Sequence, residues 1–209
     1  MNIENYLALG SEDKGWFLSY YYQVKFIHEC KAKDVLEIGV GNKTLINYLR
    51  QHNINAVSCD TVEKFRPDHI GDIRNLPFEG NSFDVVCAFQ VLEHLPWNEV
   101  EKALQEMARV SRKHVIFSIP YTPVSIELAL RSSLLYRLIR KWEARIFINL
   151  ALITRPWKYD GVHYWEMGKK NYPRKKIRTL LKKHFRILKE KRTDFSYQYF
   201  FVLEKKQNA

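Results

Sequence analysis

Residues 35–44 decide the fold, and they read Val-Leu-Glu-Ile-Gly-Val-Gly-Asn-Lys-Thr. The apolar start of this stretch is typical of a strand that is buried on both faces. Two glycines, Gly39 and Gly41, then break the run, and the polar residues 42–51 that follow are compatible with a helix. The pattern predicts a strand, a tight turn and a helix, in which the glycines let the backbone pass close to a ligand.

Two acidic residues indicate which ligand this turn suits. A dinucleotide-binding turn holds pyrophosphate at the helix N-terminus and has a third glycine, where this chain has Thr44. Glu37 lies at the end of the first strand, where a fixed carboxylate repels a pyrophosphate and attracts a cation. Asp60 ends the second apolar run, at a spacing that suits hydrogen bonds from ribose hydroxyls. These residues favour a cationic adenosine ligand that lacks phosphate, and S-adenosylmethionine fits.

Four segments of the chain resemble class I S-adenosylmethionine-dependent methyltransferases, most closely the methyltransferase type 11 subgroup. They are residues 35–41, residues 58–60, residues 71–78 (Gly-Asp-Ile-Arg-Asn-Leu-Pro-Phe) and residues 82–96 (Ser-Phe-Asp-Val-Val-Cys-Ala-Phe-Gln-Val-Leu-Glu-His-Leu-Pro). The resemblance implies a Rossmann-like, doubly wound α/β fold with a seven-stranded sheet, mostly parallel with the last strand antiparallel. At Asn42 and Lys43 the chain departs from the family, which often has a further small residue there.

The resemblance also implies roles for residues of the cofactor site. The family uses an acid and the next backbone N–H to contact adenine, which corresponds to Asp72 and Ile73. Gln90 and Val91 follow the strand expected over residues 83–89, at the sheet edge where open α/β sheets bind ligands, so we place them on the methionine side. The expected cofactor residues are Glu37, Gly39, Val40, Gly41, Asp60, Thr61, Asp72, Ile73, Gln90 and Val91.

Histidines near the end of the strand and in a later turn bear on catalysis. Related enzymes often have a His-x-x-Glu-like turn before the last helix, and here it corresponds to His163 in residues 161–168. We expect His163 on the acceptor side, as a general base or as a residue that orients the acceptor. The alternative is a histidine hydrogen-bonded within its own turn. Glu93 and His94 are more typical of a loop-to-helix hydrogen bond than of metal ligands, so we expect no metal site.

The length of 209 residues, with 46% hydrophobic content, predicts a single domain over residues 1–209 with a sizeable core. The three cysteines, Cys30, Cys59 and Cys87, are scattered, which favours small core residues in a reducing compartment. The start of the chain lacks the pattern of a signal peptide. We expect a cytoplasmic protein that can associate with a membrane, and the sequence predicts no oligomeric state.

Two segments outside the central pattern are expected to be helical. Residues 1–32 are rich in aromatic side chains and predict a helical segment that packs on the sheet edge, and the resemblance implies that this segment also roofs the cofactor site. Residues 121–160 predict an amphipathic helical insert after the fifth strand, which caps the acceptor pocket with an apolar face. Binding to an anionic membrane surface, or packing on the core or on a second subunit, are the alternatives. Basic residues interrupt the insert, so it lacks the ~20 apolar residues needed to span a bilayer.

The leading functional hypothesis is a methyltransferase that acts on a small or lipid-like acceptor through a hydroxyl. No Asn-Pro-Pro-Tyr-like tetrapeptide follows residues 83–89, which argues against methylation of amino groups on nucleic-acid bases. The alternative is a basic nucleic-acid-binding or RNA-modifying protein, since the formal net charge is +11 and residues 169–192 hold twelve Lys and Arg with one Glu. A solvated helix face explains that run equally well. A third hypothesis is a regulator that binds the cofactor without turnover.

Overall fold

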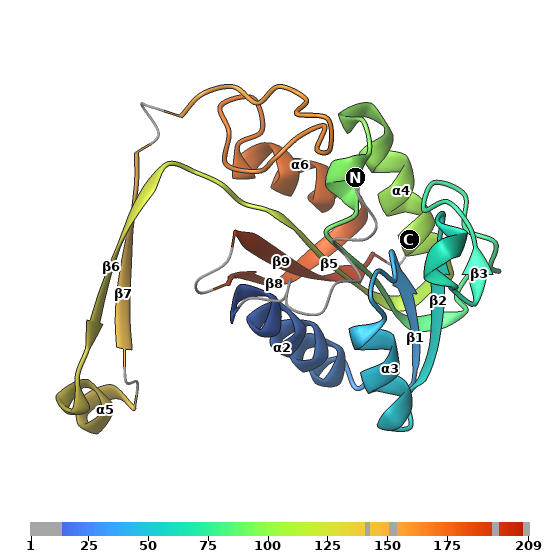
Figure 1. Cartoon of the computed structure of the whole chain (residues 1–209), viewed down its shortest axis with the longest axis horizontal. Coiled ribbons are helices and arrows are strands. Elements are labelled where there is room, and N and C mark those ends of the chain that lie inside the picture. Colours follow the sequence, from blue (N-terminus) through green and yellow to red (C-terminus); the bar gives the residue numbers. More distant parts are fainter. Residues whose placement is uncertain (1–13, 141–142, 151–153, 194–196, 207–209) are drawn as a thin grey trace.

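The structure is a computed structural model that describes residues 14–140, 143–150, 154–193 and 197–206. In these ranges seven strands form one sheet in the order β3-β2-β1-β4-β5-β9-β8, and β6 and β7 form a separate ribbon (Figure 1). The five strands β1 to β5 pair in parallel, and β9 runs antiparallel to both of its neighbours. The predicted fold class is confirmed, including the antiparallel last strand beside the fifth.

The central strands of the sheet coincide with the apolar runs of the sequence because they are covered on both faces, whereas the edge strands β3 and β8 are more exposed. The strand bounds are β1 Asp34–Ile38, β2 Asn55–Asp60, β3 His69–Ile70, β4 Phe83–Phe89, β5 Ser111–Pro120, β8 Phe185–Arg192 and β9 Gln198–Lys205. All four residues from Val35 to Ile38 are buried, as are most residues of β4. The strand order places the carboxyl ends of β1 and β4 side by side, which is where the glycine turn meets residues 90–94.

Helices cover both faces of the sheet (Figure 1). Helices α2 (Lys14–Glu29) and α3 (Thr44–Gln51) lie on one face, and α4 (Trp97–Val110) and α6 (Arg174–His184) lie on the other. Short 3-10 helices follow β2 and β4, η1 at Glu63–Phe65 and η2 at Leu92–His94. One buried apolar cluster lies on the α4 and α6 side and a second on the α2 and α3 side, so the sheet is sandwiched between two cores.

The N-terminal segment is helical where the structure describes it. Helix α2 spans Lys14–Glu29, residues 30–32 of the predicted segment are not helical, and residues 1–13 lie outside the described residues. Phe26 packs edge-on against Phe200 of β9, with ring centroids 5.7 Å apart. The Tyr20 hydroxyl lies 3.1 Å from Asn42 Oδ1, so the same helix also reaches the glycine turn. The helix therefore packs on the sheet and touches the rim of the turn.

The helical insert predicted for residues 121–160 is wrong in most of its length. Strands β6 (Ser125–Arg131) and β7 (Glu143–Asn149) pair antiparallel, and only α5 (Ser133–Ile139) at the tip is helical. Apolar residues occupy every second position of both strands, so that Leu128 faces Ile146 and Ile126 faces Ile148 across the ribbon. That period of two specifies a strand, whereas the prediction weighed only the helical spacing of leucines.

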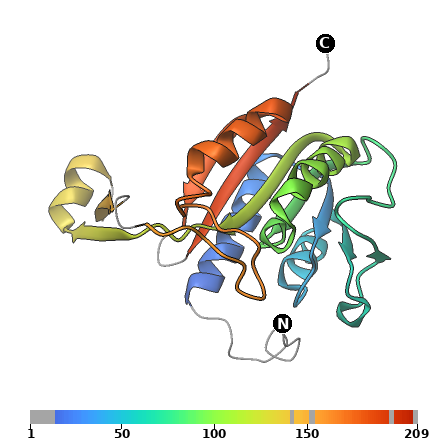
Figure 2. The ribbon, with the colours of Figure 1, turned by 90° about the horizontal axis from the view of Figure 1, so that it is seen from above.

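This segment, β6-α5-β7, forms an arm that projects away from the rest of the fold (Figures 1 and 2). It leaves the fold after β5 and does not pack over the ends of β1, β4 and β5, so the predicted cap over the acceptor pocket is wrong as well. Its apolar side chains are exposed, from Leu128 on the ribbon to Leu138 at the tip. Among the described residues, no helix is long and apolar enough to cross a bilayer.

Candidate functional site

The glycine turn after β1 is packed directly against the end of β4. Gly39 has φ +80° and Gly41 has φ +50°, which are backbone conformations that residues with a side chain rarely adopt. A Cβ built on Gly39 would lie 2.4 Å from Cγ2 of Val91, closer than any real contact. The turn and the segment after β4, which sequence reasoning assigned to one site, therefore meet at this point.

Asp60 fixes the shape of the turn from the end of β2. Its Oδ2 accepts a hydrogen bond from the backbone N–H of Val40 at 2.9 Å, and its Oδ1 accepts one from Val62 at 2.9 Å. Gly39 also donates to the carbonyl of Cys59 at 2.9 Å. A carboxylate oxygen has more than one lone-pair direction, so these bonds leave Asp60 able to accept from further hydroxyls. This bracing role was missed by sequence reasoning, which assigned Asp60 only to ribose; Thr61, the next residue, is exposed.

Glu37 points into the core layer beneath α3. The backbone N–H of Ile46, in the first turn of α3, donates to its carboxylate, and burial raises the pKa of Glu37 to about 8. The Asn42 side chain accepts from the backbone N–H of Thr44 at the start of α3, and Glu37 supplies a further acceptor for the first turn. Glu37 thus contacts the helix that follows the glycine turn. The sequence analysis expected this carboxylate to attract a cationic ligand and did not predict the contact with α3.

The adenine side predicted at Asp72 and Ile73 contains an arginine that the sequence analysis did not consider. Asp72 accepts a hydrogen bond from the backbone N–H of Arg74 at 2.8 Å and forms an ion pair with its guanidinium. The same guanidinium also pairs with Glu99 of α4. Hydrogen bonds from Arg74 hold the pKa of Asp72 below its usual range. Ile73 is buried in the core, and an adenine amino group would share the Asp72 carboxylate with Arg74.

Gln90, predicted on the methionine side, adopts an unusual backbone conformation at the end of β4. Its φ of +57° is rare for a residue with a side chain, and such strain concentrates at functional sites. Its backbone N–H donates to the Ser118 carbonyl at 3.0 Å. In the amide orientation that satisfies both ends, its side chain donates to Glu93 Oε1 at 3.3 Å and accepts from Ile119 N at 3.2 Å. Gln90 is therefore held between the ends of β4 and β5.

His163 lies at the same edge of the sheet, brought there by the loop before α6. The backbone N–H of Tyr164 donates to the Glu93 carbonyl at 2.8 Å, and Met167 donates to the Pro120 carbonyl at 3.2 Å. These bonds attach the loop to the ends of β4 and β5. The Nδ1 atom of His163 lies 3.0 Å from Glu166 Oε1, and this bond raises the pKa of His163. Both sequence hypotheses for His163, the acceptor side and a bond within its own turn, agree with this geometry.

Glu93 and His94 lie beside His163, a proximity that their sequence separation concealed. The rings of His94 and His163 have centroids 5.1 Å apart, and the possible ligand atoms of all three residues lie within 4.8 Å of one another. Burial raises the pKa of Glu93 to about 8 and lowers the pKa of His94. Within the described chain, Glu93 Oε2 has no hydrogen-bond partner, although it is fully buried.

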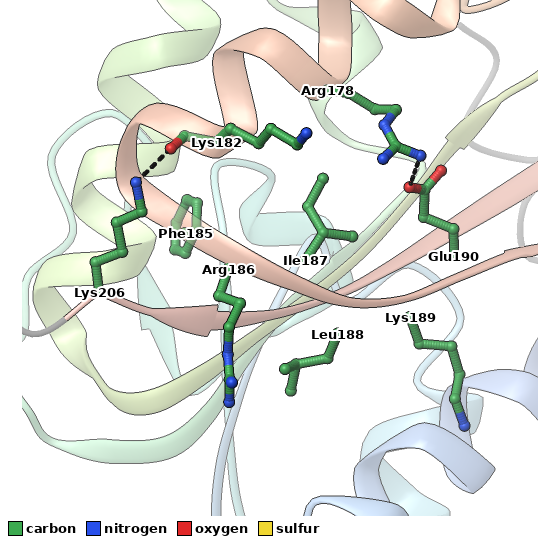
Figure 3. A pocket seen from close by; sticks show the side chains of 9 residues that line it. All are labelled: Arg178, Lys182, Phe185, Arg186, Ile187, Leu188, Lys189, Glu190 and Lys206. Atoms are coloured by element: carbon green, nitrogen blue, oxygen red, sulfur yellow. Dashed lines mark hydrogen bonds and ion pairs between the residues drawn. The ribbon is translucent and has the colours of Figure 1, made fainter.

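Most of the basic residues 169–192 form a surface away from this site, whereas Lys169 lies 3.9 Å from Glu166, beside His163. A hollow of about 640 Å³ lies between α6 and β8. Figure 3 shows the side chains that line it, which include Arg178, Lys182, Lys189 and Lys206. Glu190 pairs with both Arg174 and Arg178, each at 2.6 Å. Other cations of the run pair with acids elsewhere, namely Lys183 with Glu101, Arg186 with Glu204 and Lys189 with Glu29. These internal pairs favour a solvated, ion-paired face over a track for phosphates.

Comparisons with known proteins agree with this geometry. A family model described as "Methyltransferase domain" matches residues 36–119, which contain the turn, Asp60, Asp72 and Gln90. A search of proteins with curated function finds no match.

Solved structures share the fold at low sequence identity. The PH0226 protein from Pyrococcus horikoshii OT3 has 15% identity and a TM-score of 0.63, over 97% of this chain and 96% of that one. Magnesium protoporphyrin IX methyltransferase from Synechocystis PCC 6803, solved with bound SAH, has 15% identity and a TM-score of 0.63, over 97% and 92% of the two chains. The N-methyltransferase NodS from Bradyrhizobium japonicum WM9, also solved with S-adenosyl-L-homocysteine, has 12% identity and a TM-score of 0.61, over 98% and 97%.

Proposed function

We propose that this chain is a class I S-adenosylmethionine-dependent methyltransferase and that it methylates a hydroxyl group of a small or lipid-like acceptor. Residues 36–119 match a methyltransferase family model. The observation that carries the proposal is the packing of the Gly39 turn on Val91, with Asp60 bracing the turn from the side. A side chain at position 39 would fill the space that the turn and the end of β4 leave between them.

The residues around the turn fit S-adenosylmethionine in chemical character. Asp60 offers carboxylate oxygens toward ribose hydroxyls, Asp72 offers an acceptor for the adenine amino group, and Gln90 and Val91 lie where the methionine part is expected. When bound, the cofactor supplies a methyl group whose S–C bond breaks as the acceptor oxygen forms a C–O bond and its hydroxyl proton is released to solvent. The protein contributes alignment and exclusion of water, both of which lower the barrier to such a displacement.

The acceptor is proposed to approach from the side of His163. The loop that carries this residue is attached to the ends of β4 and β5, next to Gln90, so its imidazole is placed to orient an acceptor hydroxyl. The fold alone does not determine the acceptor, because the proteins that share it include a magnesium protoporphyrin IX methyltransferase and an N-methyltransferase. The support for a hydroxyl on a lipid-like molecule comes from the surface of this chain.

That support is the arm, which we propose to lie at an anionic membrane surface. Ile126, Leu128, Ile146 and Ile148 are each at least 45% exposed on the ribbon, and Leu138 at the tip is 70% exposed. The same part of the sequence carries Arg131, Arg137, Arg140, Lys141 and Arg145 against two acids, Glu127 and Glu143. Apolar side chains flanked by cations match a bilayer interface that contains acidic lipids. The arm leaves the fold after β5, from the edge where the site lies, so a lipid-borne hydroxyl would come close to it.

Calorimetry with S-adenosylhomocysteine tests the cofactor assignment. Asp60→Ala removes a charged acceptor of ribose hydroxyls and should weaken binding by about 10- to 100-fold, because such a bond contributes roughly 1.5–3 kcal/mol. Glu79→Ala, at an exposed acid before the amino end of β4, is the matched control and should bind like the wild type. Equal affinity of the Asp60→Ala variant and the wild type for S-adenosylhomocysteine would contradict the assignment of Asp60 to the cofactor site. Tritium transfer from labelled cofactor to a panel of hydroxyl lipids and sugars then tests the acceptor class.

A further inference from the structure

We propose that Glu93, His94 and His163 bind a divalent first-row metal ion on the acceptor side of the site. The geometry of the three side chains supports the binding of an ion. The position of that ion beside the methyl-transfer site rests on the proposed function. The sequence analysis expected no metal, because Glu93 and His94 alone are an ordinary pair. The third residue comes from a loop 69 positions further along the chain.

The three side chains converge from two segments that are attached to each other. Glu93 and His94 belong to η2 at the end of β4, and His163 belongs to the loop that the Tyr164-to-Glu93 backbone bond holds against it. Their possible ligand atoms lie within 4.8 Å of one another. Metal–ligand bonds of ~2.0–2.2 Å place two ligands of one ion at most about 4.4 Å apart. Three ligands of a tetrahedral ion lie about 3.4 Å apart, so side-chain rotations that shorten the separations by up to about 1.4 Å bring all three to a common ion.

Both imidazoles are oriented as metal-ligating histidines are. His94 Nδ1 lies 3.1 Å from the Val162 carbonyl, and His163 Nδ1 lies 3.0 Å from Glu166 Oε1. Since a carbonyl and a carboxylate oxygen accept hydrogen bonds, each Nδ1 carries the proton and donates it. Nε2 of each ring then carries a lone pair, and the His94 ring also lies within hydrogen-bond reach of the Gln90 backbone. Outer acceptors of this kind fix the tautomer and direction of histidines that bind metals.

One oxygen of the Glu93 carboxylate lacks a partner that a cation would supply. Glu93 is fully buried, and within the described residues its Oε2 has no hydrogen-bond partner. Gln90 contacts only the other oxygen, Oε1. Buried polar groups without partners are rare because they cost free energy, and coordination of a divalent ion satisfies a buried carboxylate. Two imidazoles and one carboxylate suit Mn²⁺, Fe²⁺ or Zn²⁺ better than Mg²⁺, and they leave positions open on the ion.

A second group, Asp160 with His163 and Glu166, is a weaker candidate at the same place. Asp160 Oδ1 already accepts from the backbone N–H groups of Val162 and His163, at 2.8 and 2.7 Å. Glu166 accepts from the Thr122 hydroxyl as well as lying beside His163 Nδ1. The carboxylates of this second group thus stabilise the loop, whereas the Oε2 atom of Glu93 has no hydrogen-bond partner among the described residues.

A metal ion at this place has a defined use in the proposed reaction. An open coordination position binds the acceptor hydroxyl oxygen and lowers its pKa, in the way a bound metal lowers the pKa of water. The O–H bond breaks with release of the proton to solvent, and the same oxygen forms the new C–O bond. His163 would then orient the acceptor through the ion rather than by direct contact.

Calorimetry on metal-free protein tests the site, with MnCl₂ and ZnCl₂ as probes and MgCl₂ as the control. We expect one ion per chain for Mn²⁺ or Zn²⁺, and at least about tenfold weaker binding in His94→Gln and His163→Gln. Glu93→Gln should do the same, and the two histidine variants keep the test open if this buried substitution impairs folding. His184→Gln is the matched control, because His184 contacts a carboxylate, Glu101, at 2.9 Å on a remote surface and should leave metal binding unchanged.

Binding of S-adenosylhomocysteine to the same variants separates the two proposals. Wild-type protein that binds the cofactor product but neither Mn²⁺ nor Zn²⁺ would overturn the metal site and leave the proposed function intact. Wild-type protein that binds Mn²⁺ or Zn²⁺ but not S-adenosylhomocysteine would overturn the proposed function and leave the metal site intact. Metal affinity unchanged in His94→Gln and His163→Gln, or a preference for Mg²⁺, would show that the ion is held elsewhere and would also overturn the site.

Discussion

Replacement of Gly39 by alanine tests whether the glycine turn is shaped by its contact with the end of β4. Gly39 has φ +80°, and an added Cβ would meet Val91 Cγ2 at 2.4 Å. The left-handed backbone costs a non-glycine residue ~1–2 kcal/mol. Forcing a methyl group into an occupied space costs a further ~1–3 kcal/mol. Gly39→Ala should therefore lower the free energy of unfolding by ~2–5 kcal/mol in total.

Gly161 provides a matched control for the backbone part of that cost. Its φ is +96°, and among the described residues no heavy atom lies within 4 Å of the Cβ that alanine would add. Gly161→Ala should cost only the ~1–2 kcal/mol of the backbone conformation. Urea denaturation followed by tryptophan fluorescence gives the free energy of unfolding of each variant, and the difference between the two isolates the clash with Val91.

A double variant attributes the clash to Val91. Shortening the side chain in Gly39→Ala/Val91→Ala removes Cγ2, so the two substitutions should be non-additive by ~1–3 kcal/mol. Gly39→Ala should also weaken S-adenosylhomocysteine binding, because the turn must move away from the end of β4. If Gly39→Ala is no more destabilising than Gly161→Ala, the turn and β4 are not packed as described.

Two further predictions concern a buried acid and the arm. Burial raises the pKa of Glu37 from 4.5 to about 8, so ionising it opposes folding, and its contribution to stability falls as pH rises from about 4.5 to 8. Glu37→Gln should remove that decline, which urea denaturation at several pH values measures; a decline of equal size in both proteins would show that other groups cause it. Leu138→Glu at the arm tip should reduce co-sedimentation with vesicles that contain acidic lipids, whereas Leu188→Glu, at an exposed leucine of β8, should not. Vesicle binding equal in both variants, or an arm that pairs with a second chain in ultracentrifugation, would contradict the membrane proposal.

The sequence predicts the sheet and the glycine turn well because their signals are local. The apolar runs at β1 and β4 are continuous, and the turn requires glycine where the backbone is left-handed. The arm was predicted wrongly for a physical reason. Its alternating residues, such as Ile126 and Leu128, specify strands, but leucines in its middle also fit a helix, and only the tip α5 adopts one.

The remaining features depend on contacts between distant residues, which no local pattern encodes. The sequence contains Glu93 and His163 but not the backbone bond from Tyr164 that brings them together. It likewise contains Glu37 without showing that the carboxylate lies under the first turn of α3 rather than in an open cleft. The glycine turn, Asp60 and Gln90 lie at the carboxyl ends of β1, β2 and β4, while their partners could be known only from the fold.

A crystal structure with S-adenosylhomocysteine is the most direct test of the central claim, that the edge formed by the turn and the end of β4 binds the cofactor. We predict density along the Gly39 turn, with the ribose hydroxyls on Asp60 and the amino acid part beside Gln90. Density in the basic hollow between α6 and β8 instead, or none along the turn at saturating ligand, would contradict it.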